Sequence, residues 1–117
     1  MTIQLKRIYD DASSDDGYRV LVDKLWPRGI SKDAANLDEW IKDIAPSDEL
    51  RKWFHSNRSE WGEFRNRYLS ELKKHKEALR DLASKASSEK VTLLYSSKDT
   101  EHNNAVALKE YLEKLTL

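Results

Sequence analysis

Two polar stretches of the chain follow directly after apolar runs that are typical of buried strands. The first stretch begins at Asp23, after Val20-Leu21-Val22, and continues through Trp26 and Arg28. Ligands of open α/β sheets bind outside the carboxyl ends of the strands, so an acid, an aromatic ring and a cation there indicate a ligand site. A structural interpretation has about equal weight: Asp23 caps a loop, Trp26 packs in the core and Arg28 pairs with a surface acid.

The second stretch lies between the strand-like run Val91–Tyr95 and the last helical segment. Backbone N–H groups at a helix start attract anions, and a lysine in this stretch adds to that attraction. Without a Gly-rich segment the pattern is weaker than a phosphate-binding loop. The structural alternative is that the aspartate only caps the helix and the histidine is solvated. The side chains concerned are Tyr95, Lys98, Asp99, His102, Asn103 and Asn104.

Both stretches meet in one cleft if the strands that precede them are parallel. The resulting hypothesis is a site for an anionic or nucleotide-like small molecule, with acid–base catalysis as a further option. Asp23 and His102 are the candidate proton-transfer groups. The candidate ligand-binding residues are Trp26, Arg28, Tyr95, Lys98, Asp99, Asn103 and Asn104. The pattern specifies no cofactor.

No metal site is predicted, because the three histidines are far apart in the chain and nothing has zinc-ligand spacing. An alternative function is a regulatory module that binds nucleic acid or protein through a basic helical surface of Arg51, Lys52, Arg58, Arg65 and Arg67. The 21 basic and 21 acidic residues balance, which makes nucleic acid the weaker partner.

Length and composition favour a single α/β domain over residues 1–117. There is no cysteine, so neither disulfides nor thiol chemistry is available. No apolar run approaches the roughly 20 residues of a membrane span, and the N-terminus has no signal-peptide h-region. We therefore expect a soluble, cytoplasmic protein without a membrane partner, of undetermined oligomeric state.

The apolar patterns predict three strands, over residues 3–9, 18–25 and 91–95, with about five helices. One helix is predicted over 31–45, and Ser47 is the N-cap of the next. A capping box of Asn57 and Glu60 is expected to open a long helix that breaks near His75. Asp99 or Thr100 is the expected cap of the last helix.

The orientation of the first strand is ambiguous from the residues alone. The link from Asp10 to Gly17 has only about eight residues, whereas neighbouring parallel strands normally need a dozen or more. Link length therefore favours an antiparallel pair. The fold class predicted is α/β, with a small, mostly parallel three-stranded sheet.

Several unusual sequence motifs resemble those of the family called domain of unknown function 488, in its YeaO-like branch. They include Lys6-Arg7-Ile8-Tyr9, residues 16–29 with Leu25-Trp26-Pro27-Arg28-Gly29, and residues 98–105. The resemblance implies an α/β fold in a bacterial cytoplasmic protein and brings no established activity. A wider branch places a helix between its first two strands, which favours parallel order. That branch also has a Cys-His-Arg motif where this chain reads Glu101-His102-Asn103-Asn104. Thiol chemistry of that branch is therefore not expected in this chain.

Overall fold

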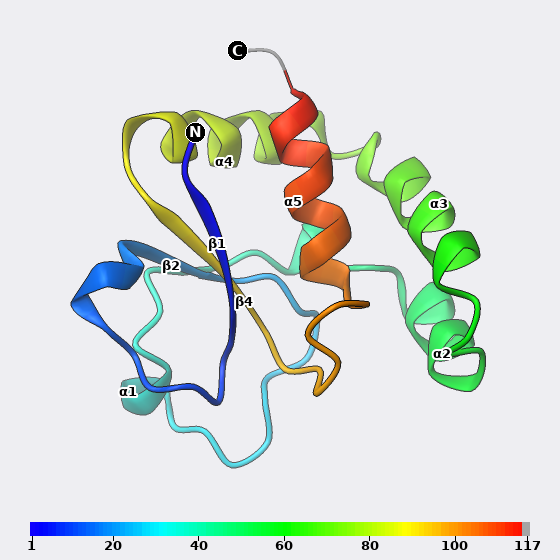
Figure 1. Cartoon of the computed structure of the whole chain (residues 1–117), viewed down its shortest axis with the longest axis horizontal. Coiled ribbons are helices and arrows are strands. Elements are labelled where there is room, and N and C mark those ends of the chain that lie inside the picture. The colour runs from blue at the N-terminus through cyan, green and yellow to red at the C-terminus, as the bar shows by residue number, and fades with distance from the viewer. Residues whose placement is uncertain (116–117) are drawn as a thin grey trace.

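Four parallel strands form one sheet in the order β1-β4-β2-β3 (Figure 1). The computed structural model describes residues 1–115. β4 lies at the centre and is buried along its whole length, as the continuous apolar run predicts. The strands are β1 (Ile3–Arg7), β2 (Tyr18–Leu21), β3 (Glu39–Trp40) and β4 (Val91–Tyr95).

The inference from link length that the first two strands are antiparallel is wrong, and the parallel order favoured by the family resemblance is confirmed. β1 and β2 are not neighbours, because β4 lies between them and pairs with both. The rule for parallel neighbours therefore does not apply to this link. The link contains a 3₁₀ turn, Ser14–Asp16, whose buried Asp16 lies against the sheet.

The prediction of a single helix over residues 31–45 is also wrong. The chain instead forms α1 (Lys32–Ala35), the two-residue β3 and a 3₁₀ turn, Lys42–Ile44. Asn36 ends α1 in the left-handed conformation, at a φ of 47°. Asp38 then bonds the β2 residue Arg19 twice, through its N–H and through its carboxylate, at 2.9 and 2.8 Å. These bonds attach the segment to the edge of the sheet as a fourth strand.

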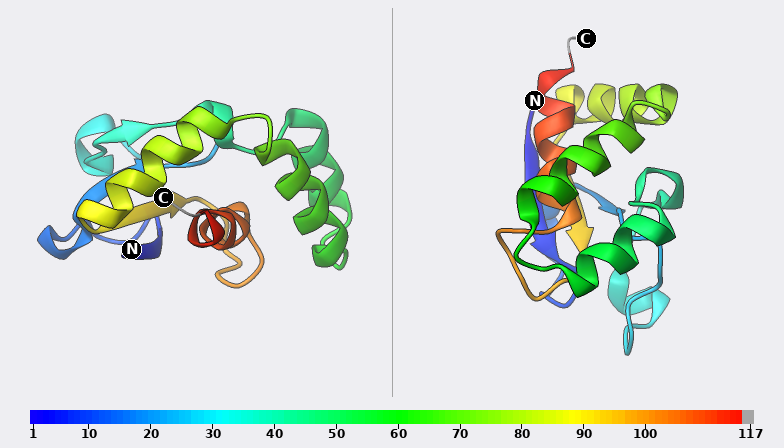
Figure 2. Two further views of the ribbon diagram at one scale, coloured as in Figure 1. Left: turned by 90° about the horizontal axis from the view of Figure 1, so that it is seen from above. Right: turned by 90° about the vertical axis from the view of Figure 1, so that its right-hand side faces the viewer.

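Four longer helices pack around the sheet (Figure 2). They are α2 (Asp48–Ser56), α3 (Trp61–Leu72), α4 (Lys76–Ser88) and α5 (Asn104–Lys114). α5 contacts β1 and β4, α3 packs on α5, and α2 packs on α3. α4 runs near the start of β1, where the Thr2 N–H donates to the Ala86 carbonyl at 3.0 Å. The main core fills the space between these helices and the side chains of Val20, Val22, Val91 and Leu93.

Helix ends were only partly predictable. Ser47 caps α2 through a bond from the Leu50 N–H, and the helical stretch breaks at His75, both as predicted. The capping box is wrong, because Asn57 donates back to Trp53 and the Glu60 side chain makes no capping bond. α5 is capped by Asn103 rather than by Asp99 or Thr100.

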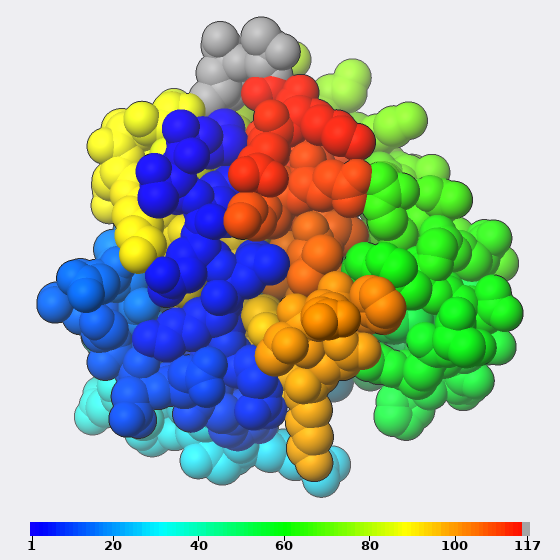
Figure 3. Space-filling view, in the orientation of Figure 1, coloured from blue at the N-terminus to red at the C-terminus, as the bar shows by residue number. Residues whose placement is uncertain are grey.

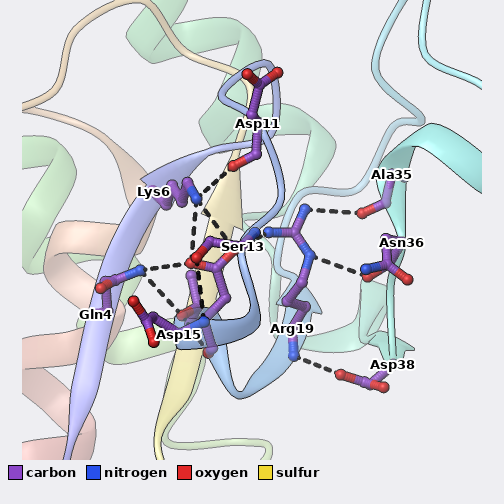
Figure 4. Close-up of polar contacts among 11 residues, drawn as sticks. Gln4, Lys6, Asp11, Ser13, Asp15, Arg19, Ala35, Asn36 and Asp38 are labelled. Atoms are coloured by element: carbon purple, nitrogen blue, oxygen red, sulfur yellow. Dashed lines mark hydrogen bonds and ion pairs between the residues drawn. The ribbon is translucent and has the colours of Figure 1, made fainter.

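The face of the sheet opposite the main core carries a buried polar cluster and the short helix α1. Figure 4 shows Gln4 and Lys6 of β1 and Arg19 of β2 converging on the turn that follows Ser13. Lys6 and Arg19 both pair with the Asp16 carboxylate. Arg19 also donates to the Ala35 and Asn36 carbonyls, at 2.8 and 3.0 Å, so it joins the strand to α1. A second, small apolar cluster of Ile8, Leu21, Ala35 and Leu94 completes this face.

Candidate functional site

A cleft of about 770 Å³ opens where the strands end. Its walls come from residues 23–28 after β2, residues 96–99 after β4, the start of α5, and the side of α2 and α3. In Figure 3 the segment after β4, coloured orange, lies between β1 in blue and the α2–α3 pair in green. Because all four strands are parallel, the two polar stretches of the sequence do meet at this edge.

Asp23 connects the two stretches. Its carboxylate accepts hydrogen bonds from the Ser96 N–H and hydroxyl, at 2.9 and 2.8 Å, and from the Asn104 amide at 3.0 Å. Its backbone carbonyl accepts a bond from the Trp40 indole at 2.7 Å. Asp23 therefore positions the ends of β2, β4 and α5 relative to one another, and both of its carboxylate oxygens are occupied by donors.

The turn after β2 is held from both sides. The Trp26 indole donates to the Ile30 carbonyl at 2.7 Å and meets Trp40 edge-on, with ring centroids 5.3 Å apart. The Tyr9 hydroxyl donates to the Arg28 carbonyl at 3.0 Å. The backbone of Arg28 is thus fixed, while its exposed side chain lines the cleft and makes no ion pair or hydrogen bond within residues 1–115.

The loop after β4 contributes Lys98 and Asp99 to the cleft. Lys98 is exposed and, like Arg28, has no acidic partner in the described part of the chain. Asp99 accepts the backbone N–H groups of His102 and Glu101, at 2.9 and 3.0 Å. The N–H bonds from His102 and from Glu101 lower the pKa of Asp99, so it is an anion at neutral pH.

Two candidate residues lie outside the cleft. The His102 ring stacks on Trp61, with centroids 5.0 Å apart, and is not part of the cleft lining. Tyr95 points into the main core with 3% exposure, and burial raises its pKa. Of the remaining candidates, Asn103 is the buried cap of α5, and Asn104 also donates to the Val22 carbonyl at 3.0 Å. Both asparagines line the cleft.

The sequence did not indicate the α2 side of the cleft. Arg51, His55 and Arg58 line it together with the buried rings of Phe54 and Phe64. The Arg58 guanidinium lies over the Phe54 ring, 4.6 Å from its centroid. Only the basic character of Arg51 and Arg58 was visible in the sequence, where it predicted a helical surface instead.

That predicted basic surface is divided in the structure. Arg65 pairs with Glu110 on α5, and Arg67 pairs with Glu63 and lies over the Trp53 ring. Only Arg51 and Arg58 of the five face the cleft.

The cleft differs in charge from the molecule as a whole. Five cations and two acids line it, a formal net charge of +3 with His55 neutral, whereas the chain sums to zero. The cations are Lys24, Arg28, Arg51, Arg58 and Lys98, and the acids are Asp23 and Asp99. Such a concave positive surface concentrates anions.

Within residues 1–115, no group of three or more His, Asp or Glu side chains is arranged to hold a metal ion. No helix in that range has the length and apolarity needed to cross a bilayer.

Comparison with known proteins shows the family relationship that the sequence motifs suggested. The model of a family described as "Inactive DUF488-N3 subclade" matches residues 2–116. The chain belongs to this family. It is 50% identical over 115 residues to a protein of Escherichia coli (strain K12) described as "Uncharacterized protein YeaO", covering 98% of this chain and 100% of that one.

A mycobacterial relative matches over a shorter range. The chain is 49% identical over 70 residues to "Uncharacterized protein Rv3073c" of Mycobacterium tuberculosis (strain ATCC 25618 / H37Rv), which covers 60% of this chain and 59% of the relative. No solved structure gives a significant match. None of these descriptions names an activity.

Proposed function

We propose that the cleft at the strand ends binds a small anionic molecule. The observation that carries this proposal is the lining charge of +3 in a molecule whose total charge is zero. Arg28 and Lys98 supply the two lining cations that have no acidic partner among residues 1–115, and each comes from a loop that follows a strand. Arg28 would grip a carboxylate or phosphate through its planar fork, and Lys98 would add a point charge.

Apolar surface in the same cleft suits the rest of such a ligand. The cleft lining includes Leu25, Trp26 and Pro27 from the loop after β2, and Phe54 and Phe64 from α2 and α3. Small-molecule sites commonly combine apolar walls with a few oriented polar groups, in volumes of roughly 300–1,000 Å³. A nucleotide-like molecule, with a flat ring and an acidic group, has both properties.

Binding is better supported than catalysis. Both Asp23 carboxylate oxygens already accept hydrogen bonds, and the His102 ring stacks on Trp61 away from the cleft. An acid–base pair would need free access to the ligand. The description of the family as inactive points in the same direction. We therefore assign Asp23 a positioning role and propose that His102 has no part in proton transfer.

Thermal unfolding in the presence of nucleotides and acidic metabolites tests the proposal. A ligand at 100 times its Kd should stabilise the protein by about 2.7 kcal/mol. Arg28→Gln should abolish this stabilisation and leave the unliganded Tm nearly unchanged, because the side chain is exposed and unpaired within residues 1–115.

Arg80→Gln is the matched control, since Arg80 is exposed on α4 outside the cleft. It should retain full ligand-induced stabilisation. If no anion in the panel raises the Tm, or if Arg28→Gln itself unfolds the protein, the proposed function is wrong.

A further inference from the structure

We infer that the ligand carries two negative charges on one group joined to a flat apolar ring, as in an aryl phosphate monoester. This inference rests on the proposed function and makes it more specific. It follows from which cations of the cleft have acidic partners and which have none within residues 1–115.

Three of the five cations have acidic partners. Lys24 and Arg51 share Asp48, at 3.6 and 3.5 Å, and Arg58 lies 3.7 Å from Asp99. These pairs are long and solvent-exposed, so each contributes little to stability, but they do reduce the local charge. Asp48 added to the lining charges leaves a net charge of +2.

In that sum the one charge left on Lys24 and Arg51 is offset by Asp23. The remainder equals the charge of Arg28 and Lys98, which have no acidic partner within residues 1–115. They project from the loops after β2 and β4, and Asp23 fixes those loops against each other through Ser96. A group with a single negative charge would leave one of these cations uncompensated. A phosphate monoester carries nearly two charges above its second pKa, close to 6, and has three acceptor oxygens for both side chains.

The apolar walls require more than a free phosphate ion. Trp26 is held by its bond to the Ile30 carbonyl and by its contact with Trp40, so its ring is already oriented. Phe54 is 5% exposed and fixed between Phe64 and Arg58. A flat ring against the partly exposed Trp26 and the exposed Leu25 would release water from apolar surface and add affinity beyond that of the charged group.

Isothermal titration calorimetry at pH 8 with phenyl phosphate and phenyl sulfate tests the inference. The two probes have the same ring, and they carry about two charges and one charge respectively at this pH. Phenyl phosphate should bind at least about tenfold more tightly, because one additional charge-assisted hydrogen bond has that effect on Kd. It should also bind more tightly than inorganic phosphate, which lacks the ring.

Variants locate the effect. Arg28→Gln and Lys98→Gln should each bring the two phenyl compounds to similar affinity, whereas Arg80→Gln should keep the difference. Equal affinity of the native protein for both compounds would overturn the two-charge inference while leaving the anion site intact. Binding of neither compound would also overturn it, and the proposed function would then be decided separately by the metabolite panel.

Discussion

Four residues donate hydrogen bonds to the buried carboxylate of Asp16: Gln4, Lys6, Ser13 and Arg19. Burial alone raises the pKa of this group, but the Ser13 N–H and the two cations outweigh it and lower the pKa to about 2. Since that value lies below the ordinary 3.8, Asp16 stabilises the fold fully above about pH 5 and loses the contribution as pH falls toward 2.

We predict that Asp16→Asn lowers the free energy of unfolding by roughly 3 kcal/mol at pH 7, because Arg19 remains buried without its counter-charge. Urea unfolding at pH 7 measures this loss. Between pH 5 and pH 2.5 the variant should also lose less stability than the native protein does. Asp15→Asn is the control, since Asp15 is exposed and its carboxylate has no donor within residues 1–115; a loss equal to that of Asp16→Asn would contradict the assignment.

The link from β1 to β2 depends on one glycine. Gly17 has a φ of 63°, and a Cβ at this position would overlap the Lys90 carbonyl, which accepts a bond from the Tyr18 N–H at 2.9 Å. An alanine would therefore be strained in conformation and would also disturb the start of the β2–β4 pairing. A Cβ at Gly62, near the start of α3, would have no other atom within 4 Å.

We predict opposite signs for the two alanine substitutions. Gly17→Ala should lower the free energy of unfolding by about 2–4 kcal/mol, from the left-handed backbone and the overlap together. Gly62→Ala should raise it by up to about 1 kcal/mol, because alanine favours the helix. Thermal unfolding of both variants checks this, and a neutral Gly17→Ala would mean that the turn can move away from Lys90.

Elements with strong local signals were predictable, and those that depend on distant contacts were not. The apolar run Val91–Tyr95 predicted β4 correctly. The spacing of Leu37, Trp40 and Ile44 imitated a helix, although the first two pack near Leu94 and Ile44 packs in the main core. β3 has only two residues and depends on Asp38 bonding Arg19, which no local pattern reveals.

The same distinction between local signals and distant contacts holds for the cleft. Asp23, Arg28 and Lys98 follow strands, so parallel order alone brings them to one edge. Arg51 and Phe54 reach the cleft because α2 lies beside that edge, and this placement comes from packing between elements that are distant in sequence. The stacking of the His102 ring on Trp61 likewise could not be predicted from the spacing of residues in the sequence.

At the scale of the whole molecule, the charges sum to zero, whereas the cleft at the strand ends has a net positive lining. Arg65 and Arg67, which an extended nucleic-acid surface would use, pair with Glu110 and Glu63 instead. A long polyanion therefore finds two of the five cations of the predicted basic surface already paired with acids. This arrangement favours a small ligand over a nucleic acid.

We predict that fluorescently labelled DNA or RNA binds no more tightly than about 1 μM at physiological salt, as is typical of non-specific contacts. Fluorescence anisotropy at several salt concentrations measures both the affinity and its dependence on salt. The affinity should fall steeply with salt, by close to one logarithmic unit per phosphate contact for each tenfold rise in salt concentration. Nanomolar, sequence-selective binding would overturn the preference for a small molecule.

The central position of β4 has a consequence for synthesis on the ribosome. β1 and β2 share no ladder with each other, and both align on a strand that begins at Val91. A nascent chain that has released its first 90 residues has therefore made both flanking strands without the one that joins them. Until β4 emerges, their backbone edges are open to wrong partners, including other copies of the chain. Closure of the sheet must then occur late and over long sequence separations, which slows folding.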